Sequence, residues 1–496
     1  MENKISLKLS LAPCILLIVL LAVNVWTFGD EATSGPCQTA LLISSILAGI
    51  IGHKKLGLSY REIERKAIHS IVLAMEAIII LLIVGATIAL WIQAGIVPSI
   101  IYYGLKTLSP SSFLLIACLI CSMVSLAIGS SWSTMGTIGV ALIGIGKALG
   151  YKEPIIAGAI ISGAYLGDKM SPLSDTTNLA PAVSGVNLFS HVRNMLNTTI
   201  PAYTLTLLIF FLIGLVSTRN TVELTEISKI LNSLEKNFYI HWFFFIVPAL
   251  VIYLAIRKTP PIPALTVGCL LGGILSFLFQ NSDLLTTTDF QSISSLVNLV
   301  TKSYEKTIHV AYYGYQLQSG IPVLDELLSA GGMEKMFSTV TLIIMAMLFG
   351  GVMEATGMLG RIAEGILSLV RTSGGLMAST VITSIIFNIF AAEQYLSIVI
   401  TGRMFRNTYK HKNLDLLNLS RTLEDGGTVT SVLVPWNTCG AFASSVLGVP
   451  TLQYLPYCFF NLLTPIISIA MAKLNYNVIV KSYQDQEDSI DETYKR

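Results

Sequence analysis

Charged residues are scarce in this chain. Only 12% of its 496 residues are Asp, Glu, Lys or Arg, and 53% are hydrophobic, whereas soluble domains carry roughly 25% charged residues. The net charge is only +2, which indicates no basic surface for nucleic acid. The chain also lacks the HExxH motif of zinc proteases and the GxSxG motif of serine hydrolases. These absences argue against a soluble protein and against either enzyme class.

The few cysteines and the N-terminal stretch carry little chemistry. Cys118 and Cys121 form a CxxC spacing inside an apolar stretch, which favours small core side chains over redox or metal chemistry. Lys4, Lys8 and the apolar run 11–25 resemble a signal peptide, but no small-residue cleavage site follows. We therefore interpret this stretch as an uncleaved first membrane span.

Apolar runs near the roughly 20 residues that cross a bilayer recur along the chain. They predict an all-α polytopic membrane protein with about ten transmembrane helices and two re-entrant hairpins, in two inverted repeats with broken helices. The predicted first repeat (1–217) holds spans 11–28, 39–52, 68–95 and 198–216, hairpin 112–149 and broken helix 154–190. After a connecting loop (218–238), the predicted second repeat (239–473) holds spans 239–256, 262–280, 337–357 and 452–472, outer loop 281–335, hairpin 373–405 and broken helix 422–448, and residues 474–496 form a tail.

Basic residues in the loops predict how the chain is oriented. The strongly basic stretches 54–66, 257–258 and 403–421 all fall on one side in this topology, and the loop 302–335 on the other side is nearly charge-balanced. The positive-inside rule places the basic side, with both termini, in the cytoplasm. Lys147 and Lys152 fit this arrangement less well.

Polar segments interrupt the apolar runs at matching places in both halves. The first is GDKMSPLSDTTN at 167–178, and the second runs from EDGGT at 424–428 to PWNT at 435–438. The hairpin tips at 129–134 and 391–395 also correspond. Charges at membrane depth are costly unless they are buried in protein or line a cavity. Paired broken segments therefore predict a transport site for an ion or small solute at the repeat interface.

The breaks and tips supply oxygen-bearing side chains, which are the ligands that Na⁺ prefers. One buried carboxylate can bind Na⁺ and H⁺ in turn, and that competition is sufficient for exchange. We predict Na⁺ binding at Asp168, Ser171, Asp175 and Asn178. The full set of predicted ion- or proton-binding residues is Asp168, Asp175, Ser130, Ser131, Thr134, Ser171, Ser174, Thr176, Asn178, Glu393, Glu424, Asp425, Thr428, Asn437 and Thr438.

Structural roles compete with this interpretation in the first break and the second tip. For Asp168 and Asp175 the alternative to ion binding is a helix cap or an ion pair with Lys169, and of the two we favour Asp168 as the residue that titrates. Lys169 is itself a candidate internal cation, replacing Na⁺ when the site is empty. Glu393 is also suited to cap a helix at the second hairpin tip.

Two further groups of carboxylates have alternatives of their own. Glu424 and Asp425 directly follow a basic loop, so a surface ion pair with Arg421 is the alternative to ion binding. Glu76 is expected in the middle of span 68–95, where a carboxylate is a functional candidate by default. It has few polar neighbours in the sequence.

The segment GDKMSPLSDTTNLAP at 167–181 resembles the signature of the NhaC-type Na⁺/H⁺ antiporters. The resemblance extends from about the second span to the last and implies an inner-membrane bacterial antiporter of the ion-transporter superfamily fold, without cofactor, that exchanges Na⁺ for H⁺ by alternating access. Its partners would be these two ions and the lipid bilayer, with a homodimer as a candidate assembly. Further similar segments are SSWST (130–134), GGM (331–333), AEQ (392–394), EDG (424–426) and PWNT (435–438).

Some proteins of this kind exchange malate and lactate, so an organic-anion exchanger coupled to Na⁺ or H⁺ is the alternative. Lys169 is the only strong cation at the breaks, and two aspartates lie close to it in the sequence. This balance favours a cation as substrate. A channel is disfavoured because broken helices in an inverted pair indicate alternating access.

Overall fold

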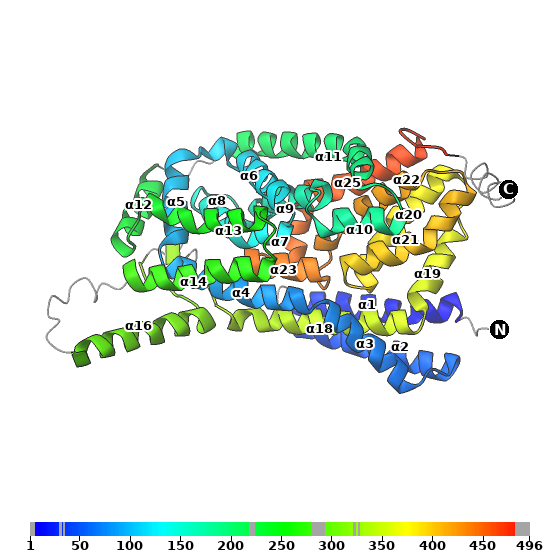
Figure 1. The fold of residues 1–496 in the computed structure, drawn as a ribbon, viewed down its shortest axis with the longest axis horizontal. Coiled ribbons are helices and arrows are strands. Elements are labelled where there is room, and N and C mark those ends of the chain that lie inside the picture. Colours follow the sequence, from blue (N-terminus) through cyan, green and yellow to red (C-terminus); the bar gives the residue numbers. More distant parts are fainter. Residues whose placement is uncertain are drawn as a thin grey trace, which may run out of the picture.

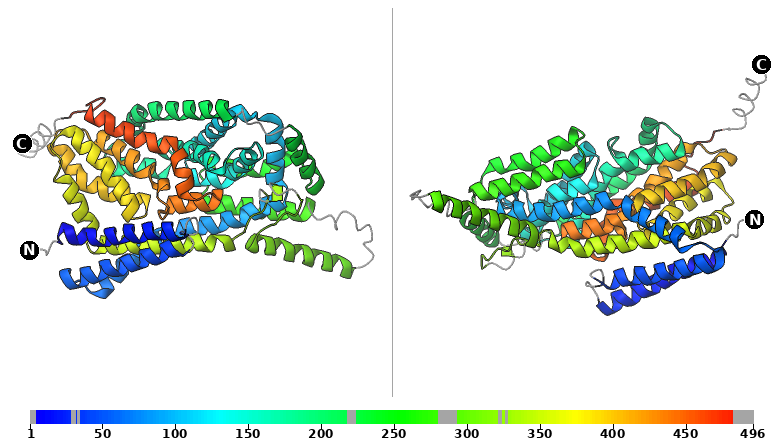
Figure 2. Two further views of the ribbon diagram at one scale, coloured as in Figure 1. Left: turned by 180° about the vertical axis from the view of Figure 1, so that it is seen from behind. Right: turned by 60° about the horizontal axis from the view of Figure 1, so that its bottom comes forward.

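The computed structural model describes residues 5–28, 32, 35–217, 224–279, 293–320, 324–325 and 328–481. In these ranges the only β-structure is two isolated bridges, Tyr315–Ala330 and Leu414–Val480. Most long helices run along the long axis of the molecule (Figures 1 and 2). Eight described helices are long and apolar enough to cross a membrane, or up to ten if each of two bent pairs counts as one span. The predicted all-helical, polytopic fold class is confirmed.

The first half of the chain runs from α1 to α11. Its helices are α1 (Leu7–Phe28), α2 (Pro36–Leu56), α3 (Tyr60–Leu73), α4 (Met75–Gln93), α5 (Ile96–Thr107), α6 (Phe113–Ile128), α7 (Ser131–Thr134), the π-helical turn η3 (Met135–Gly139), α8 (Val140–Ala148), α9 (Glu153–Met170), α10 (Asp175–Ser184) and α11 (Leu188–Ser217). Helix α1 packs against α2, and α18 (Phe337–Ala355) packs against both α2 and α3. The hairpin and the broken helix of this half lie in the interior of the bundle (Figure 1).

Two boundaries in the first half differ from expectation. The predicted single span 68–95 is wrong, because the chain forms two helices that meet at Ala74. A capping box between Ser59 and Glu62 starts α3 early, and Glu76 lies in the first turn of α4 rather than in mid-span. Helix α11 begins at Leu188, ten residues before the predicted start of the last span of this half.

The second half has a similar order of elements. Its main helices are α12 (Leu224–Asn237), α13 (Ile246–Ile256), α14 (Pro261–Phe279), α16 (Ile293–Tyr313), α18, α19 (Met358–Leu367), α20 (Ser373–Phe390), α21 (Gln394–His411), α22 (Leu416–Leu423), the π-helical turn η7 (Glu424–Thr428), the 3₁₀ turn η8 (Ser431–Leu433), α23 (Thr438–Leu447), α24 (Thr451–Tyr454) and α25 (Phe459–Lys473). Helix α16 occupies part of the predicted outer loop 281–335, which is therefore not wholly a loop. The chain from α12 to α13 bends by 88°, and the chain from α24 to α25 by 61°.

The sequence led us to expect a helix break at the polar segment 424–428, but the helix continues through it. It continues α22 as a π-helical turn, in which the Val429 N–H donates to the Glu424 carbonyl (3.3 Å). The helix is interrupted further on, at residues 434–437, before α23 begins. Parts of the predicted loops 218–238 and 281–335, Lys4 and the tail beyond residue 481 lie outside the described residues.

Backbone features recur in the two halves at one constant spacing. Each hairpin tip has a left-handed residue followed by an extended N-cap residue, each broken helix resumes at an N-cap residue in extended conformation, and each resumed helix ends at a left-handed glycine. The N-cap and glycine pairs, all 263 residues apart, are residues 130 and 393, 174 and 437, and 185 and 448. These pairs support the predicted repeat, although its inverted orientation stays a prediction.

The same spacing corrects the expected match between the two polar segments. Pro172 corresponds to Pro435, but Asp168 corresponds to Ser431. Glu424 lies seven residues before that counterpart, inside η7. The carboxylates of the two halves therefore do not occupy equivalent positions.

Close packing of α6 on α9 depends on two glycines. A Cβ atom at Gly163 would collide with the Cys118 carbonyl oxygen, and one at Gly167 with Ser125. The Ser125 hydroxyl donates a hydrogen bond across this contact to the Ala164 carbonyl. The first arm of the hairpin and the broken helix are therefore held in direct backbone contact.

Substitution of Gly167 by Ala is expected to force α6 and α9 apart. We expect the free energy of unfolding to fall by roughly 1–3 kcal/mol, the usual cost of overpacking, measured as a lower thermal unfolding midpoint in detergent. Gly360→Ala in α19 is the matched control, because a Cβ there would meet no atom within 4 Å. Equal midpoints for the two variants would contradict the packing argument.

Candidate ion-binding site

Asp168 lies in the last turn of α9, where the polar break begins. Its carboxylate accepts hydrogen bonds from the Ser131 backbone N–H (3.0 Å) and from the Ser131 hydroxyl. Its backbone carbonyl, left free by the end of the helix, accepts from the hydroxyls of Thr176 (3.0 Å) and Thr177 (2.6 Å). Side chains from the start of α10 thus complete the end of α9, and Asp168 is tied to the first hairpin tip.

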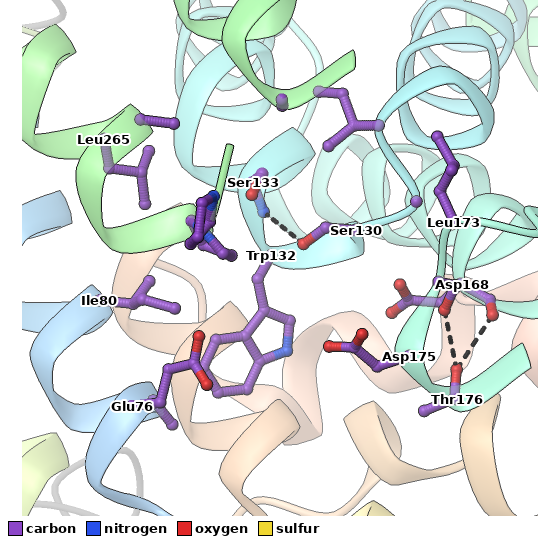
Figure 3. Close-up of a pocket in the computed structure, with 18 of the residues that line it drawn as sticks. Glu76, Ile80, Ser130, Trp132, Ser133, Asp168, Leu173, Asp175, Thr176 and Leu265 are labelled. Carbon is purple, nitrogen blue, oxygen red and sulfur yellow. Dashed lines mark hydrogen bonds between the residues drawn. The ribbon is translucent and has the colours of Figure 1, made fainter. Parts of the chain in front are cut away.

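A cavity of about 550 Å³ lies beside this carboxylate. Of the residues that the structure describes, four carboxylates line it, those of Glu76, Asp168, Asp175 and Glu393, and Lys258 is the one Lys or Arg in its wall. Asp168 and Glu393 are each only 6% exposed, whereas Asp175 and Glu76 are exposed to the cavity. In Figure 3, Glu76 and Asp175 approach the Trp132 ring from opposite sides.

Both halves contribute to the cavity wall. The first half gives the start of α4, the tip at Ser130 and the α9–α10 break, and the second gives the α13–α14 loop, the tip at Glu393 and the start of α23. The Thr438 N–H donates to the Ala392 carbonyl (3.0 Å), which joins the second broken helix to the second tip. Trp132 stacks on Phe442, with ring centroids 4.1 Å apart. The first break, the start of α23 at the end of the second predicted break, and the two tips therefore meet at one place.

The two tip residues are helix caps as well as cavity residues. Glu393 is the N-cap of α21, and its Oε2 accepts from the Leu396 N–H (3.0 Å). Ser130 is the N-cap of α7, and its hydroxyl accepts from the Ser133 N–H (3.2 Å). The capping role that the sequence allowed for Glu393 is confirmed, and the same side chain lines the cavity.

Several other predicted residues hold the backbone of the breaks and tips and do not line the cavity. The Ser171 hydroxyl donates to the Leu126 carbonyl (2.8 Å), and the Thr134 hydroxyl to the Ser130 carbonyl (2.9 Å). Asn437 caps α23 by accepting from the Cys439 N–H (3.0 Å). The predicted residues that do line the cavity are Ser130, Asp168, Ser174, Asp175, Thr176, Asn178, Glu393 and Thr438.

The amide of Asn178 braces the first break from the cavity side. Its nitrogen donates to the carbonyls of Pro172 (2.8 Å) and Ser174 (2.7 Å). Of the four predicted Na⁺ ligands, Asp168, Asp175 and Asn178 therefore share the cavity, and Ser171 points to α6 instead.

Lys169 forms a buried ion pair on another face of α9, outside the cavity. Its Nζ lies 2.7 Å from Asp425 Oδ1 and donates to the Thr198 hydroxyl (3.0 Å), which lies 2.9 Å from the same carboxylate oxygen. Lys169 and Asp425 are both completely buried. The expected alternative, a pair between Lys169 and Asp168 or Asp175, is wrong, because Lys169 pairs with Asp425 instead. Asp168 and Lys169 are consecutive helical residues, so their side chains point about 100° apart.

Glu424 and Arg421 lie beside this pair and are also buried. Arg421 Nη1 donates to Asn194 Oδ1 (3.3 Å) and to the Asn477 carbonyl (3.4 Å). The proposed surface ion pair of Arg421 with Glu424 or Asp425 is therefore wrong. Within the described ranges, neither Glu424 carboxylate oxygen has a hydrogen-bond partner.

Three residues of this region were not among the predicted site residues. Thr198 joins both partners of the buried pair, and Gln394 lines the cavity while its Oε1 accepts from Ser431 (3.2 Å). Glu76 was expected in mid-span and instead reaches the cavity from the start of α4. Gln394 could have been found from its place next to Glu393 at the tip, whereas Thr198 lies in the uncharged polar segment NTT at 197–199, which gave no sign of an ionic contact.

The chain matches a known protein family over most of its length. The sequence pattern of the Na⁺/H⁺ antiporter family matches residues 163–475, which include both breaks and the second tip. The chain belongs to the Na⁺/H⁺ antiporter family. The predicted resemblance to NhaC-type antiporters is thereby confirmed, and the protein is a multi-pass member of a transporter family.

Relatives in this antiporter family differ in what their names say they carry. The chain is 38% identical to the malate-2H⁺/Na⁺-lactate antiporter of Bacillus subtilis, over 86% of both chains. It is 37% identical to the Na⁺/H⁺ antiporter NhaC of Alkalihalophilus pseudofirmus, over 88% of this chain and 90% of the relative. It is 35% identical to the arginine/ornithine antiporter ArcD of Halobacterium salinarum, over 99% of this chain and 96% of the relative.

The buried pair can be tested by a double-mutant cycle. Lys169→Met or Asp425→Asn alone is expected to lower the free energy of unfolding by roughly 3–5 kcal/mol, because each leaves an uncompensated buried charge. The double variant is expected to recover most of that loss, measured by thermal unfolding of the purified protein. A double variant no more stable than either single variant would show that the two charges do not compensate each other.

Proposed function

We propose that this antiporter exchanges Na⁺ for H⁺ and that both ions compete for Asp168. The observation that carries the proposal is a buried carboxylate at the end of a broken helix, on the wall of a cavity shared by both halves. Ser131 holds that carboxylate through a backbone N–H and a hydroxyl, so its position is fixed before an ion binds.

The charge of the cavity wall supports a cation as the exchanged solute. Four carboxylates line the cavity against the single ammonium group of Lys258. Lys169, the cation that the sequence placed at the break, is buried against Asp425 and does not line the cavity. The role of Lys169 as an internal cation for the transported ion therefore loses support, and we assign it to the buried pair.

Competition for one carboxylate also supplies the coupling. Either Na⁺ or H⁺ neutralises the charge on Asp168, with Asp175 and the hydroxyl of Thr176 close by on the cavity side. The empty anionic site is costly to carry across a low-dielectric barrier. The protein therefore changes conformation only when one of the two ions is bound, which links their movements in opposite directions.

We extend the proposal to place and assembly. The basic loops favour a cytoplasmic location for both termini, and α1 begins and α25 ends toward the same end of the molecule (Figure 1). We propose the bacterial inner (plasma) membrane as its location, which the bacterial origin of two relatives supports. A homodimer stays a prediction.

A second candidate function is exchange of an organic solute coupled to Na⁺ or H⁺. The observation that favours it is the cavity volume, about 550 Å³, which falls in the range of roughly 300–1,000 Å³ typical of small-molecule sites. Two relatives are named for organic solutes, malate and lactate in one and arginine and ornithine in the other, and a cavity of this volume can hold molecules of that size. Proteoliposomes tested separately with Na⁺, K⁺, malate, lactate and arginine would identify which solute drives proton counter-movement.

Asp168→Asn is expected to abolish Na⁺-dependent collapse of a pH gradient, because the neutral amide can no longer exchange one cation for another. The measurement is fluorescence of a pH-sensitive dye in everted vesicles, with the amount of inserted protein determined in the same vesicles. Glu64→Gln, which removes an exposed carboxylate on α3, is the matched control and should retain exchange. Retained exchange in Asp168→Asn would remove this residue from the mechanism.

Direct competition also predicts how the rate depends on pH. Lowering the pH by one unit raises the proton concentration tenfold, so the apparent KM for Na⁺ should rise by up to about tenfold while the maximal rate is unchanged. Initial rates in proteoliposomes with equal pH on both sides measure both quantities. A fall in maximal rate at constant KM would instead indicate that the two ions bind at separate places.

A further inference from the structure

A second, smaller cavity of about 220 Å³ lies further along the same bundle. Its wall contains Gly85, Gly144 and Ser445, and the charged side chains of Lys147, Glu153 and Lys335. Lys147 and Glu153 form an ion pair between α8 and the start of α9. A cavity of this size with polar walls can hold several water molecules.

Four segments line both cavities, each with one part at the first cavity and another at the second. These segments are α4, the run from α7 through η3 to α8, α9 and α23. The residue pairs, with the first-cavity residue named first, are Ile80 and Gly85, Thr137 and Val140, Asp168 and Glu153, and Thr438 and Ser445. The two cavities are therefore successive chambers along one set of helices.

The chambers approach each other closely along α4 and α23, whereas their lining residues on α9 lie about 22 Å apart. An α-helix rises about 1.5 Å per residue, so the five residues from Ile80 to Gly85 span about 7.5 Å and the seven from Thr438 to Ser445 about 10 Å. This thickness corresponds to one layer of side chains.

Apolar side chains around a π-helical turn form that layer. Val84 and Met135 are completely buried, and a Cβ atom at Gly136 in η3 would lie 3.2 Å from Val84 Cγ2. Phe442 from the second half stacks on Trp132 just before η3. Single π-helical turns occur often at functional sites, because the extra residue distorts the helix locally.

We propose that the second cavity is the opposite mouth of the transport path, and that Val84, the turn η3 and Phe442 form the barrier that opens when the first cavity closes. The solute that passes is the hydrated cation of the proposed function, on which this assignment of cargo rests. The existence of the path does not depend on that cargo. The basic loop 257–258, which we expect in the cytoplasm, contributes Lys258 to the first cavity, so we place that cavity on the cytoplasmic side. The predicted outer loop contributes Lys335 to the second cavity, which we place on the exterior side.

Accessibility to a charged, membrane-impermeant thiol reagent tests the proposal. Leu173→Cys places a thiol in the first cavity and Ser445→Cys one in the second. We expect at least tenfold faster labelling of Leu173→Cys from the cytoplasmic face and of Ser445→Cys from the external face, measured by mass spectrometry on everted and right-side-out vesicles. The unsubstituted protein, with its seven native cysteines, gives the background.

Labelling of both positions from one face, or no labelling of Ser445→Cys from either face, would overturn the proposal. The result is separable from the proposed function, because labelling requires no knowledge of the transported ion. Opposite labelling without Na⁺/H⁺ exchange would support the path and reject the cargo.

Weakening the barrier gives an independent readout. Val84→Ala is expected to raise the Na⁺-independent dissipation of a pH gradient in proteoliposomes several-fold, because the side-chain layer loses two methyl groups. Val340→Ala in α18 is the matched control, since it removes the same atoms from a nearly buried position that lines neither cavity. Equal leak rates in the two folded variants would place the barrier elsewhere.

Discussion

The hydrogen bonds between Ser131 and Asp168 are the contact on which the site depends. A carboxylate at membrane depth is tolerated only when donors or a cavity surround it, and here a hairpin tip supplies both an N–H and a hydroxyl. The contact requires that α6 and α9 lie close together, which Gly163 and Gly167 permit. The first tip and the first broken helix therefore form one structural unit around one acidic group.

The same unit separates two neighbouring charges, one at the cavity and one in the protein interior. Asp168 faces the cavity, while its neighbour Lys169 faces Asp425 and Thr198 in the interior. The cavity thus has an excess of carboxylates, and the cation that would have neutralised them is engaged elsewhere. Our assignment of a cationic cargo and our assignment of Lys169 to a structural ion pair are two consequences of the same helix geometry.

The sequence predicted the helical fold, and its breaks and tips supplied residues that meet at the cavity. Polar residues within apolar runs carry a strong signal, because they are costly in lipid. The contacts of individual hydroxyls were not predictable. Ser171 and Thr176 lie in one short break, yet one turns to α6 and the other to the cavity. The π-helical form of 424–428 was hidden because its glycines and acids suggest a break.

Asp168 and Lys169 are neighbours in α9 but point to different surroundings, and this limits how the length of α9 can change. A single inserted or deleted residue between Glu153 and Asp168 would rotate the far end of the helix by about 100°. The acidic group would then turn toward the interior and the ammonium group toward another neighbour. We therefore expect the sixteen positions from Glu153 to Asp168 to admit changes of side chain but not of number.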